Sequence, residues 1–375
     1  MSGIESPSTI KLPEVKNSHE SKDILYFTLR NTNISIANAI RRTILADIKT
    51  VVINSDEKDI DIEKNTSKFN NEIIKQRLGC IPVHIKDFEG VEHLSIELDI
   101  ENDNDSLVYI TTKNIKIKNK LLNTYLTDKV TTQIFPANKK TKFYILIARL
   151  RPKISKYLPG EILKLKANFK IGTAGENGMY NVVHTCAYGY TPDEIEQADK
   201  WEEVEKLLTS QKISPQEITK KKQNWYTLDA KRYYIIDSFD FQIGTVGVFT
   251  NMEIIHKACN ILINKLKNIS EKCDAENLEL DKISTAMENC VDIKLIGEGY
   301  TIGKIIEYIL HYDYYLNDHQ LSYVGFLKKH PHDTFSIIRI IFKEKDHFTD
   351  TNIYAMIKYT CLTGIKIFDT IKEYF

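Results

Sequence analysis

The stretch NTNISIANAIRRTIL, from Asn31 to Leu45, has the residue pattern of a helix with one apolar face. Its apolar residues recur every three or four positions, which places them on one face of a helix. That face is formed by Ile36, Ala37, Ile40, Ile44 and Ile48. Ser35 stands where a helix N-cap is expected. The pattern predicts a short amphipathic helix, with Arg41 and Arg42 beside its apolar stripe.

The same order of strands and helices occurs twice along the sequence. The first copy has a strand from Ile24, the short helix, a strand from Tyr233, and a long amphipathic helix. The apolar face of that long helix carries Ile255, Ala258, Leu262, Leu266 and Ile269. The second copy repeats the order with strands near 291–295 and 335–342. Its two helices carry the apolar residues Ile302, Ile305, Ile306, Ile309, Leu310, Ile353, Met356, Ile357, Ile365, Phe368 and Ile371.

Neither copy has enough strands to cover the apolar faces of its own helices. Two such units packed helix against helix would close a shared core. We therefore predict an α+β fold, with two dimerisation modules packed together and a β-rich insert in the first. The predicted boundaries are a disordered arm at 1–22, a first module at 23–55 and 230–272, an insert at 56–229, a linker at 273–289 and a second module at 290–375.

The insert is predicted from strand-like alternation, as at Leu94, Ile96, Leu98 and Ile100. One helix is expected within it, followed by a lysine-rich loop at 220–222. Gly364 lies inside the last predicted helix and weakens the prediction of one unbroken helix there.

The composition favours protein partners over nucleic acid. Lys+Arg and Asp+Glu are both 51, so the formal net charge is zero, whereas a chain that grips nucleic acid with its whole surface is usually basic. Six dispersed cysteines without CxxC spacing indicate a reducing compartment. The first residues lack the apolar core of a signal peptide, and no run approaches the length of a membrane span. We expect a soluble intracellular protein with no membrane partner.

Two motifs could in principle bind a nucleotide or a metal, but a purely structural role explains each of them better. GTAGENG, at 172–178, lacks the spacing of either phosphate-binding glycine motif. His330 and His332 have no cysteine or clustered acid nearby, and zinc needs three or four ligands. We find no triad and no acid–base pair, so we expect no catalysis by this chain.

Two segments resemble a known family. NTNISIANAIRRTIL is similar to the signature of RNA polymerase alpha-type subunits, which include the archaeal D subunit and the eukaryotic third-largest subunit. NNEIIKQRLGCIPV, at 70–83, resembles the segment of that family ending in Arg-Leu-Gly-x-Ile-Pro. FDFQIGTVGVFTNMEIIHKACNILINKL resembles its closing strand and helix.

The last hundred residues resemble the smaller partner, the archaeal L or eukaryotic eleventh subunit. GEGYTIGKIIEYIL, at 297–310, and SYVGFLKKHPHDTFSIIRI, at 322–340, carry the similarity. Fusions of this kind resemble the polymerase subunits of large cytoplasmic DNA viruses. The resemblance therefore implies location in the viral particle and in the viral factory of the host cytoplasm.

The resemblance implies a non-catalytic assembly platform of a DNA-directed RNA polymerase. Its partners would be the largest and second-largest subunits and small polymerase subunits, with DNA reached only indirectly. The alternative is a stand-alone nucleic-acid-binding transcription factor, which would use the 220–222 lysines. Some relatives carry a zinc site or an iron–sulfur cluster in the insert. This insert holds only Cys80 and Cys186, so we predict no metal and no cofactor.

The resemblance also implies roles for single residues. Arg41, Arg42 and Arg77 are the predicted contacts with the large subunits. The predicted intramolecular dimer interface consists of Ile40, Ile44, Ile255, Leu262, Ile305, Ile306, Ile309 and Phe368. The second half departs from its family at Lys304 and Tyr308, where Asn and Arg are usual.

Overall fold

The computed structural model describes residues 10–55, 59–155, 157, 159–283 and 288–375. It contains helices and several antiparallel sheets, so the predicted α+β class is confirmed. The chain divides into two compact units. Unit 1 comprises 1–43, 185–244 and 255–375, and unit 2 comprises 44–184 and 245–254. Among the described residues, none of the helices is both long and apolar enough to cross a membrane.

The first sheet of unit 1 has the strand order β1-β2-β12-β11. Its strands are β1 (Glu14–Ser21), β2 (Ile24–Arg30), β11 (Val183–Pro192) and β12 (Tyr234–Thr245). In β2, Leu25, Phe27 and Leu29 are buried on one face, and Tyr26 and Arg30 on the other face are more exposed, although Thr28 between them is also buried. This is the two-residue period of a sheet with one covered face.

Strand β1 corrects the prediction of a disordered arm at 1–22 for residues 14–21, whereas residues 1–9 of that arm lie outside the described residues. Glu14–Ser21 pairs antiparallel with β2 although its sequence, EVKNSHES, is polar and exposed. Backbone pairing with an apolar neighbour is enough to order such a strand, and apolar alternation, on which the prediction relied, plays no part in it. A register shift between Lys16 and His19 interrupts this edge strand, and such irregularities discourage pairing with other chains.

The second sheet of unit 1 has the order β13-β14-β16-β15. Its strands are β13 (Glu279–Ile283), β14 (Cys290–Ile296), β15 (Leu321–Leu327) and β16 (Phe335–Phe342). β13 pairs with β14, so this part of the predicted 273–289 linker is a strand. Residues 284–287, also within that linker, lie outside the described residues.

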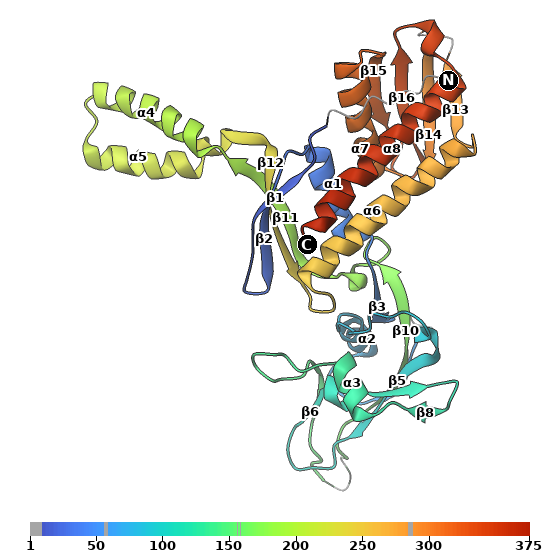
Figure 1. Ribbon diagram of the computed structural model, residues 1–375. Coiled ribbons are helices and arrows are strands. Elements are labelled where there is room, and N and C mark those ends of the chain that lie inside the picture. The colour runs from blue at the N-terminus through green and yellow to red at the C-terminus, as the bar shows by residue number, and fades with distance from the viewer. Residues whose placement is uncertain (1–9, 56–58, 156, 158, 284–287) are drawn as a thin grey trace. The chain divides into compact units, whose positions relative to one another are not determined.

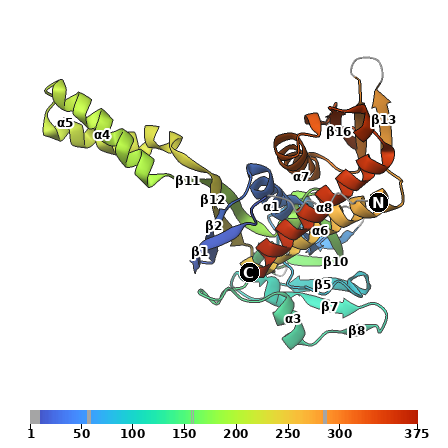
Figure 2. The same ribbon diagram turned by 45° about the horizontal axis from the view of Figure 1, so that its top comes forward.

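Four helices pack with these two sheets, and the longest two lie side by side in both views (Figures 1 and 2). They are α1 (Ile34–Ala46), α6 (Asn251–Asp274), α7 (Tyr300–Leu310) and α8 (Asp350–Glu373). A π-helical stretch, His311–Asn317, continues α7, and a short 3-10 helix, Lys345–His347, precedes α8. α8 is a single helix across Gly364.

Helices α4 (Glu194–Ser210) and α5 (Pro215–Thr227) form a hairpin that extends from β11 and β12 (Figures 1 and 2). A short 3-10 helix, Asp229–Arg232, returns the chain to β12. The predicted lysine-rich loop at 220–222 is therefore wrong, because these lysines lie within α5. Trp201, which is buried, and Trp225 pack with ring centroids 5.7 Å apart and hold the two helices together.

Unit 2 is built on a larger sheet of order β3-β10-β5-β7-β8, with β4 also paired to β10. Its strands are β3 (Lys49–Ile53), β4 (Ile60–Asn65), β5 (Leu94–Glu101), β7 (Lys116–Asn119), β8 (Thr124–Tyr125) and β10 (Ile162–Thr173). A separate ribbon pairs β6 (Val108–Thr111) with β9 (Leu146–Leu150). The helices are α2 (Asn71–Gly79) and α3 (Asp128–Ile134), with 3-10 turns at Val91–His93, Thr112–Asn114 and Gly178–Tyr180.

Several alternating residues predicted for the insert face one core, whereas Phe143 and Ile145, predicted to alternate in the same way, are exposed. Ile96 and Leu98 of β5 are buried with Leu163, Leu165 and Ala167 of β10 in one cluster. The contact-defined units nevertheless differ from the predicted boundaries. The hairpin α4–α5 falls in unit 1, although it lies inside the predicted 56–229 insert. It does so because its core residues pack on each other and on the ends of β11 and β12.

Gly364 is compatible with an unbroken α8 because a neighbouring helix occupies the space beside it. A Cβ atom on Gly364 would lie 2.8 Å from Cδ1 of Leu266 on α6, and 3.5 and 3.6 Å from side-chain atoms of Ile309 and Ile305 on α7. The absent side chain lets three helices approach at one point. The cost of glycine in a helix interior, about 1 kcal/mol relative to alanine, is offset by this close packing.

We predict that Gly364→Leu lowers the free energy of unfolding by about 1–3 kcal/mol, because the larger side chain overpacks the contact with Leu266. Gly364→Ala should change it by less than about 1 kcal/mol, since helix propensity offsets a contact with a movable methyl group. Urea denaturation measures both. Adding Leu266→Ala to Gly364→Leu should recover part of the loss, and strictly additive effects would contradict the assigned contact.

Candidate functional site

The short helix α1 begins at a cap supplied by Asn33. The side-chain Oδ1 of Asn33 accepts a hydrogen bond from the Ser35 N–H at 2.8 Å, and its carbonyl accepts from the N–H groups of Ile36 and Ala37. Asn33 therefore takes the capping position that the sequence pattern assigned to Ser35. Both residues are good caps, and only the backbone geometry decides between them.

Arg41 and Arg42 lie beside the buried stripe of α1, and each has a single polar partner. Arg41 donates from Nε and Nη2 to Oδ1 of Asn38, at 3.1 and 2.9 Å. Arg42 is exposed and donates from Nε to the hydroxyl of Thr301 at 3.3 Å. Neither guanidinium has a carboxylate partner among the described residues. Each therefore keeps donors for a further acceptor, since a guanidinium carries five.

The bond from Arg42 to Thr301 joins the two halves of the sequence. Thr301 lies in the first turn of α7, whose buried residues form the stripe predicted for the second half. Gly303 follows in that turn, and a Cβ atom there would lie 2.0 Å from Cε2 of Phe326 on β15. The ring of Phe326 thus fixes how closely α7 approaches its sheet.

The predicted interface residues are all buried, and several of them meet. Ile40, Ile44, Ile255, Leu262, Ile305, Ile306, Ile309 and Phe368 are each at most 1% exposed. Ile305 and Ile309 meet α8 and Leu266 of α6 at Gly364. At this point apolar residues from both halves of the sequence form one core. Burial by itself does not distinguish an interface residue from an ordinary core residue.

Helices α6 and α8 run antiparallel along their length. Near the start of α8, the Tyr354 hydroxyl donates to the carbonyls of Glu276 and Leu278, which follow the end of α6. One turn later Lys358 pairs with Asp274, the last residue of α6. Residues further along α8 therefore face earlier residues of α6.

The C-terminal end of the chain completes this packing on the first sheet. The ring of Phe375 meets that of Phe27 on β2 edge to face, with centroids 4.9 Å apart. Phe27 also stacks on Phe241 of β12 at 4.9 Å. Aromatic pairs in this range contribute about 0.5–1.5 kcal/mol beyond their burial. The last residue of the second half thus packs on the sheet of the first.

The two departures in the second half have local structural partners. Lys304 pairs with Glu307 and lies 5.8 Å from the ring centroid of Phe326. Glu307 in turn accepts the N–H of Phe326 at 3.1 Å. Burial raises the pKa of Tyr308 to about 12, so its hydroxyl stays neutral. Lys304 therefore helps to hold α7 on β15, whereas Tyr308 packs near Tyr312, with ring centroids 6.2 Å apart.

Arg77 lies in unit 2 and two of its guanidinium donors are engaged within the chain. It donates from Nε to the carbonyl of Ile147 at 2.8 Å and from Nη2 to that of Leu146 at 2.6 Å. It also lies over the ring of Phe69, 5.3 Å from the centroid. These contacts attach α2 to β9. The structure therefore gives Arg77 an internal role that sequence reasoning missed.

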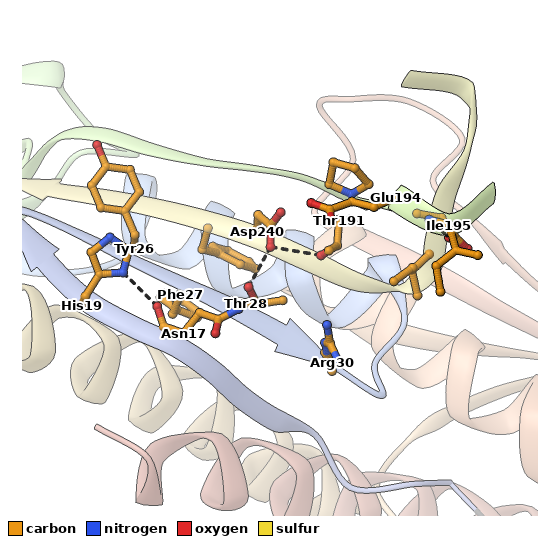
Figure 3. Close-up of a pocket in the computed structure, with 14 residues that line it drawn as sticks. Asn17, His19, Tyr26, Phe27, Thr28, Arg30, Thr191, Glu194, Ile195 and Asp240 are labelled. Atoms are coloured by element: carbon orange, nitrogen blue, oxygen red, sulfur yellow. Dashed lines mark hydrogen bonds between the residues drawn. The ribbon is translucent and has the colours of Figure 1, made fainter. Parts of the chain in front are cut away.

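A groove of about 590 Å³ lies along the first sheet (Figure 3). Asp240 accepts hydrogen bonds there from the hydroxyls of Thr28 at 2.8 Å and Thr191 at 3.0 Å. The ring of His19 stacks on Tyr26 and its Nδ1 lies 3.0 Å from the carbonyl of Asn17. The hydroxyls of Thr28 and Thr191 thus both donate to the same carboxylate oxygen. The groove has the character of a structural polar network.

The described residues contain no group of three or more His, Cys, Asp or Glu side chains that could hold a metal ion. The cysteines differ sharply in exposure. Cys80 is exposed, whereas Cys186, Cys259, Cys273, Cys290 and Cys361 are buried. Burial raises the pKa of Cys186, Cys259 and Cys273 to about 12 each. These thiols stay protonated near neutral pH and behave as small apolar side chains.

We predict that Arg77→Met lowers the free energy of unfolding by about 1–3 kcal/mol, because two carbonyls lose a charged donor. Arg42→Met should change it by less than about 1 kcal/mol, since its hydrogen bond is exposed. Urea denaturation followed by circular dichroism compares the two. Equal losses would contradict the internal role of Arg77.

We further predict that iodoacetamide modifies Cys80 alone in the folded protein at pH 8. Only a thiolate reacts, and a folded-state pKa of about 12 keeps Cys186, Cys259 and Cys273 as thiols. Peptide mass spectrometry locates the label.

Since the pKa values of these buried thiols are raised above the unfolded value of about 8.5, the contribution of the thiols to the free energy of unfolding is complete below that pH. It decreases as the pH rises from about 8.5 to 12.

Comparison with known proteins places these features in one context. The profile of the RNA polymerase Rpb3/Rpb11 dimerisation domain matches residues 26–266. Subunit 3B of DNA-directed RNA polymerases IV and V from Arabidopsis thaliana is 30% identical over 208 residues, which cover 50% of this chain and 58% of that protein. The chain therefore matches little more than half the length of this relative.

Two other relatives are matched over more of their length. The RNA polymerase II subunit RPB3 of Schizosaccharomyces pombe is 24% identical over 268 residues, covering 68% of this chain and 86% of that protein. The RNA polymerase subunit Rpo3 of Methanosphaera stadtmanae is 24% identical over 294 residues, covering 68% of this chain and 96% of that protein.

Proposed function

Because the chain belongs to the family of RNA polymerase Rpb3/Rpb11 dimerisation domains, we propose that it is a non-catalytic assembly subunit of a multisubunit DNA-directed RNA polymerase. The packing of α6 against α8 and α7 carries this proposal. It buries apolar faces from both halves of the sequence in one core. A dimerisation module needs such a partner for its helices, and here the partner belongs to the same chain.

In this proposal the two halves form an intramolecular heterodimer. The first half corresponds to the third-largest subunit and the second to the eleventh. The contacts at Gly364, between Lys358 and Asp274, and between Phe375 and Phe27 support it, because each joins the two halves. Covalent linkage gives the halves an effective concentration on the order of millimolar for a short connection. Pairing then no longer depends on matched expression of two chains.

The exposed side of α1 is the proposed docking surface for the second-largest subunit. Arg41 and Arg42 are anchored at one edge of each guanidinium and retain free donors. This geometry suits bidentate recognition of a carboxylate or of backbone carbonyls. Arg77 lies in unit 2 and remains a separate proposed contact with the large subunits, with two of its donors engaged by carbonyls of β9.

The wider context of the proposal rests on the resemblance of the fused halves. The largest subunit and small polymerase subunits would be the other partners, with DNA reached through the assembled enzyme. Fusion in this order further supports a viral polymerase, located in the viral particle and in the host cytoplasm. The alternative of a stand-alone nucleic-acid-binding factor would use Lys220 to Lys222, which lie exposed on α5 next to the acidic α4.

We predict that replacing both arginines, as Arg41→Glu with Arg42→Glu, leaves the chain folded but lowers recovery of the two largest subunits roughly tenfold or more. Loss of one or two interface hot spots costs about 2 kcal/mol or more, and 1.4 kcal/mol is tenfold. Tagged chain is purified from its native source and the co-purifying subunits are quantified by mass spectrometry.

Two control variants make this result specific. Lys231→Glu with Arg232→Glu changes the same charge at another exposed place in unit 1 and should retain the large subunits. Thr301→Ala removes only the acceptor of Arg42 and should retain them as well. Unchanged recovery with the Arg41 and Arg42 variant would exclude α1 as the docking surface.

A further inference from the structure

Positive charge is concentrated in one part of this neutral chain. Residues 129–160 contain eight Lys and Arg and no Asp or Glu, although the whole sequence has 51 of each class. The stretch runs from α3 through β9 to the loop before β10, all within unit 2. Such a local excess creates a positive potential that the net charge conceals.

The ribbon of β6, which is labelled in Figure 1, and β9 has one buried face and one exposed face. Ile110, Ala148 and Leu150 face the core of unit 2 and are fully buried. On the other face, Tyr109 lies opposite Arg149, with the guanidinium 5.3 Å from the ring centroid. Tyr109 is nevertheless 53% exposed. The ribbon thus presents an aromatic ring that a cation orients but does not cover.

The turn before β9 adds lysines and a second ring. Asn138 builds this turn, because its Oδ1 accepts from the N–H groups of Lys140 and Thr141 and its N–H donates to the carbonyl of Phe143. Lys142 adopts a left-handed conformation with φ of 61°. Lys139 and Lys142 are exposed as a result, and Phe143 is 76% exposed.

The cations of this surface are not neutralised by the protein. Lys139, Lys142 and Arg149 have no carboxylate within ion-pair distance among the residues that the structure describes. Arg151 differs, since it pairs with the buried carboxylate of Glu161. The positive charge that follows β9 is therefore paired with a carboxylate. The positive charges on β9 and in the turn before it are unpaired.

An acidic loop lies at the paired end. Residues 101–106 are held there by Asn102, whose amide donates to the carbonyl of Leu150 at 3.0 Å. The lysine-bearing turn lies at the other end of β9. A strand of five residues spans roughly 16 Å, which exceeds the Debye length of about 8 Å at physiological ionic strength. The acidic loop therefore screens the lysines only weakly.

We propose that single-stranded RNA binds the ribbon surface, formed by Tyr109, Lys139, Lys142, Phe143, Ile145 and Arg149. Unpaired cations contact the phosphates, and the exposed rings of Tyr109 and Phe143 stack on bases. Alternating cations and aromatic rings are the usual means of binding single strands without sequence preference. Direct contact at this surface goes beyond the indirect contact with nucleic acid that was expected from the sequence.

Two considerations favour RNA over other polyanions. Stacking needs unpaired bases, which duplex DNA does not present, whereas an acidic peptide would not need open ring faces. The choice of RNA over single-stranded DNA rests on the proposed function, because an RNA polymerase releases a single-stranded RNA product. The RNA-binding measurement uses the isolated chain, so its failure is distinct from failure to recover the large subunits.

The test is fluorescence anisotropy of a labelled 20-nucleotide poly-U RNA titrated with the full chain over a range of salt concentrations. Lys139→Gln with Lys142→Asn should weaken binding and reduce the magnitude of the log–log salt slope by about 1.4, since each phosphate contact on a single strand contributes about 0.7. Asparagine is chosen because it tolerates the left-handed conformation at 142.

Phe143→Leu separates stacking from apolar contact. It keeps an apolar side chain of similar reach but loses the ring, so RNA affinity should fall about fivefold or more with an unchanged salt slope. The matched control is Lys220→Gln with Lys221→Gln, which removes two charges from α5 and should leave RNA binding unchanged. Circular dichroism verifies that every variant is folded.

Three results would overturn the proposal. One is equal loss of binding in the α5 control, which would indicate a general charge effect. Another is tighter binding of a duplex DNA of equal length than of the RNA. The third is a poly-Glu peptide that competes with RNA for the chain, together with a Phe143→Leu variant that binds both the peptide and the RNA as tightly as the unmodified chain does.

Discussion

The antiparallel packing of α6 against α8 is the constraint on which unit 1 depends. Each helix has 24 residues and one apolar face, and neither face can be covered by the sheet of its own half alone. The close approach at Gly364 brings Leu266, Ile305 and Ile309 into one core. A fully buried Leu or Ile side chain contributes about 1.5–3 kcal/mol. The shared core is therefore a large part of the stability of both halves.

Polar contacts at the margins of this core determine the register of the two helices. Tyr354 donates to carbonyls beyond the end of α6, and Lys358 pairs with Asp274. Such exposed pairs add little free energy, but they are compatible with only one alignment. The edge-to-face contact of Phe375 with Phe27 then fixes the far end of α8 on the first sheet. Apolar burial stabilises the pair and directional contacts align it.

Arginine residues in this chain illustrate how one residue type serves different purposes. Arg77 uses its fork to satisfy two carbonyls of β9. Arg149 lies over a tyrosine ring, and Arg339 makes two hydrogen bonds to the buried carboxylate of Asp292. Arg41 and Arg42 combine partial anchoring with free donors. Anchoring reduces the conformational entropy lost when a partner binds, which is why these two suit an interface.

Periodicity in the sequence is sufficient to predict the α+β class, the repeated order of strand and helix, and the apolar stripes of α1, α6, α7 and α8. Periodicity is a local property. The strand β1 could be recognised only in the folded chain, since its polar residues are ordered by backbone pairing with β2. The structure also assigned the cap of α1 to Asn33, placed Lys220 to Lys222 on a helix, and occupied Arg77 with the carbonyls of β9. It explained Gly364 through Leu266, which lies 98 positions earlier in the sequence. Contacts between residues so far apart have no local signal, so the sequence could identify the candidate residues but not their partners.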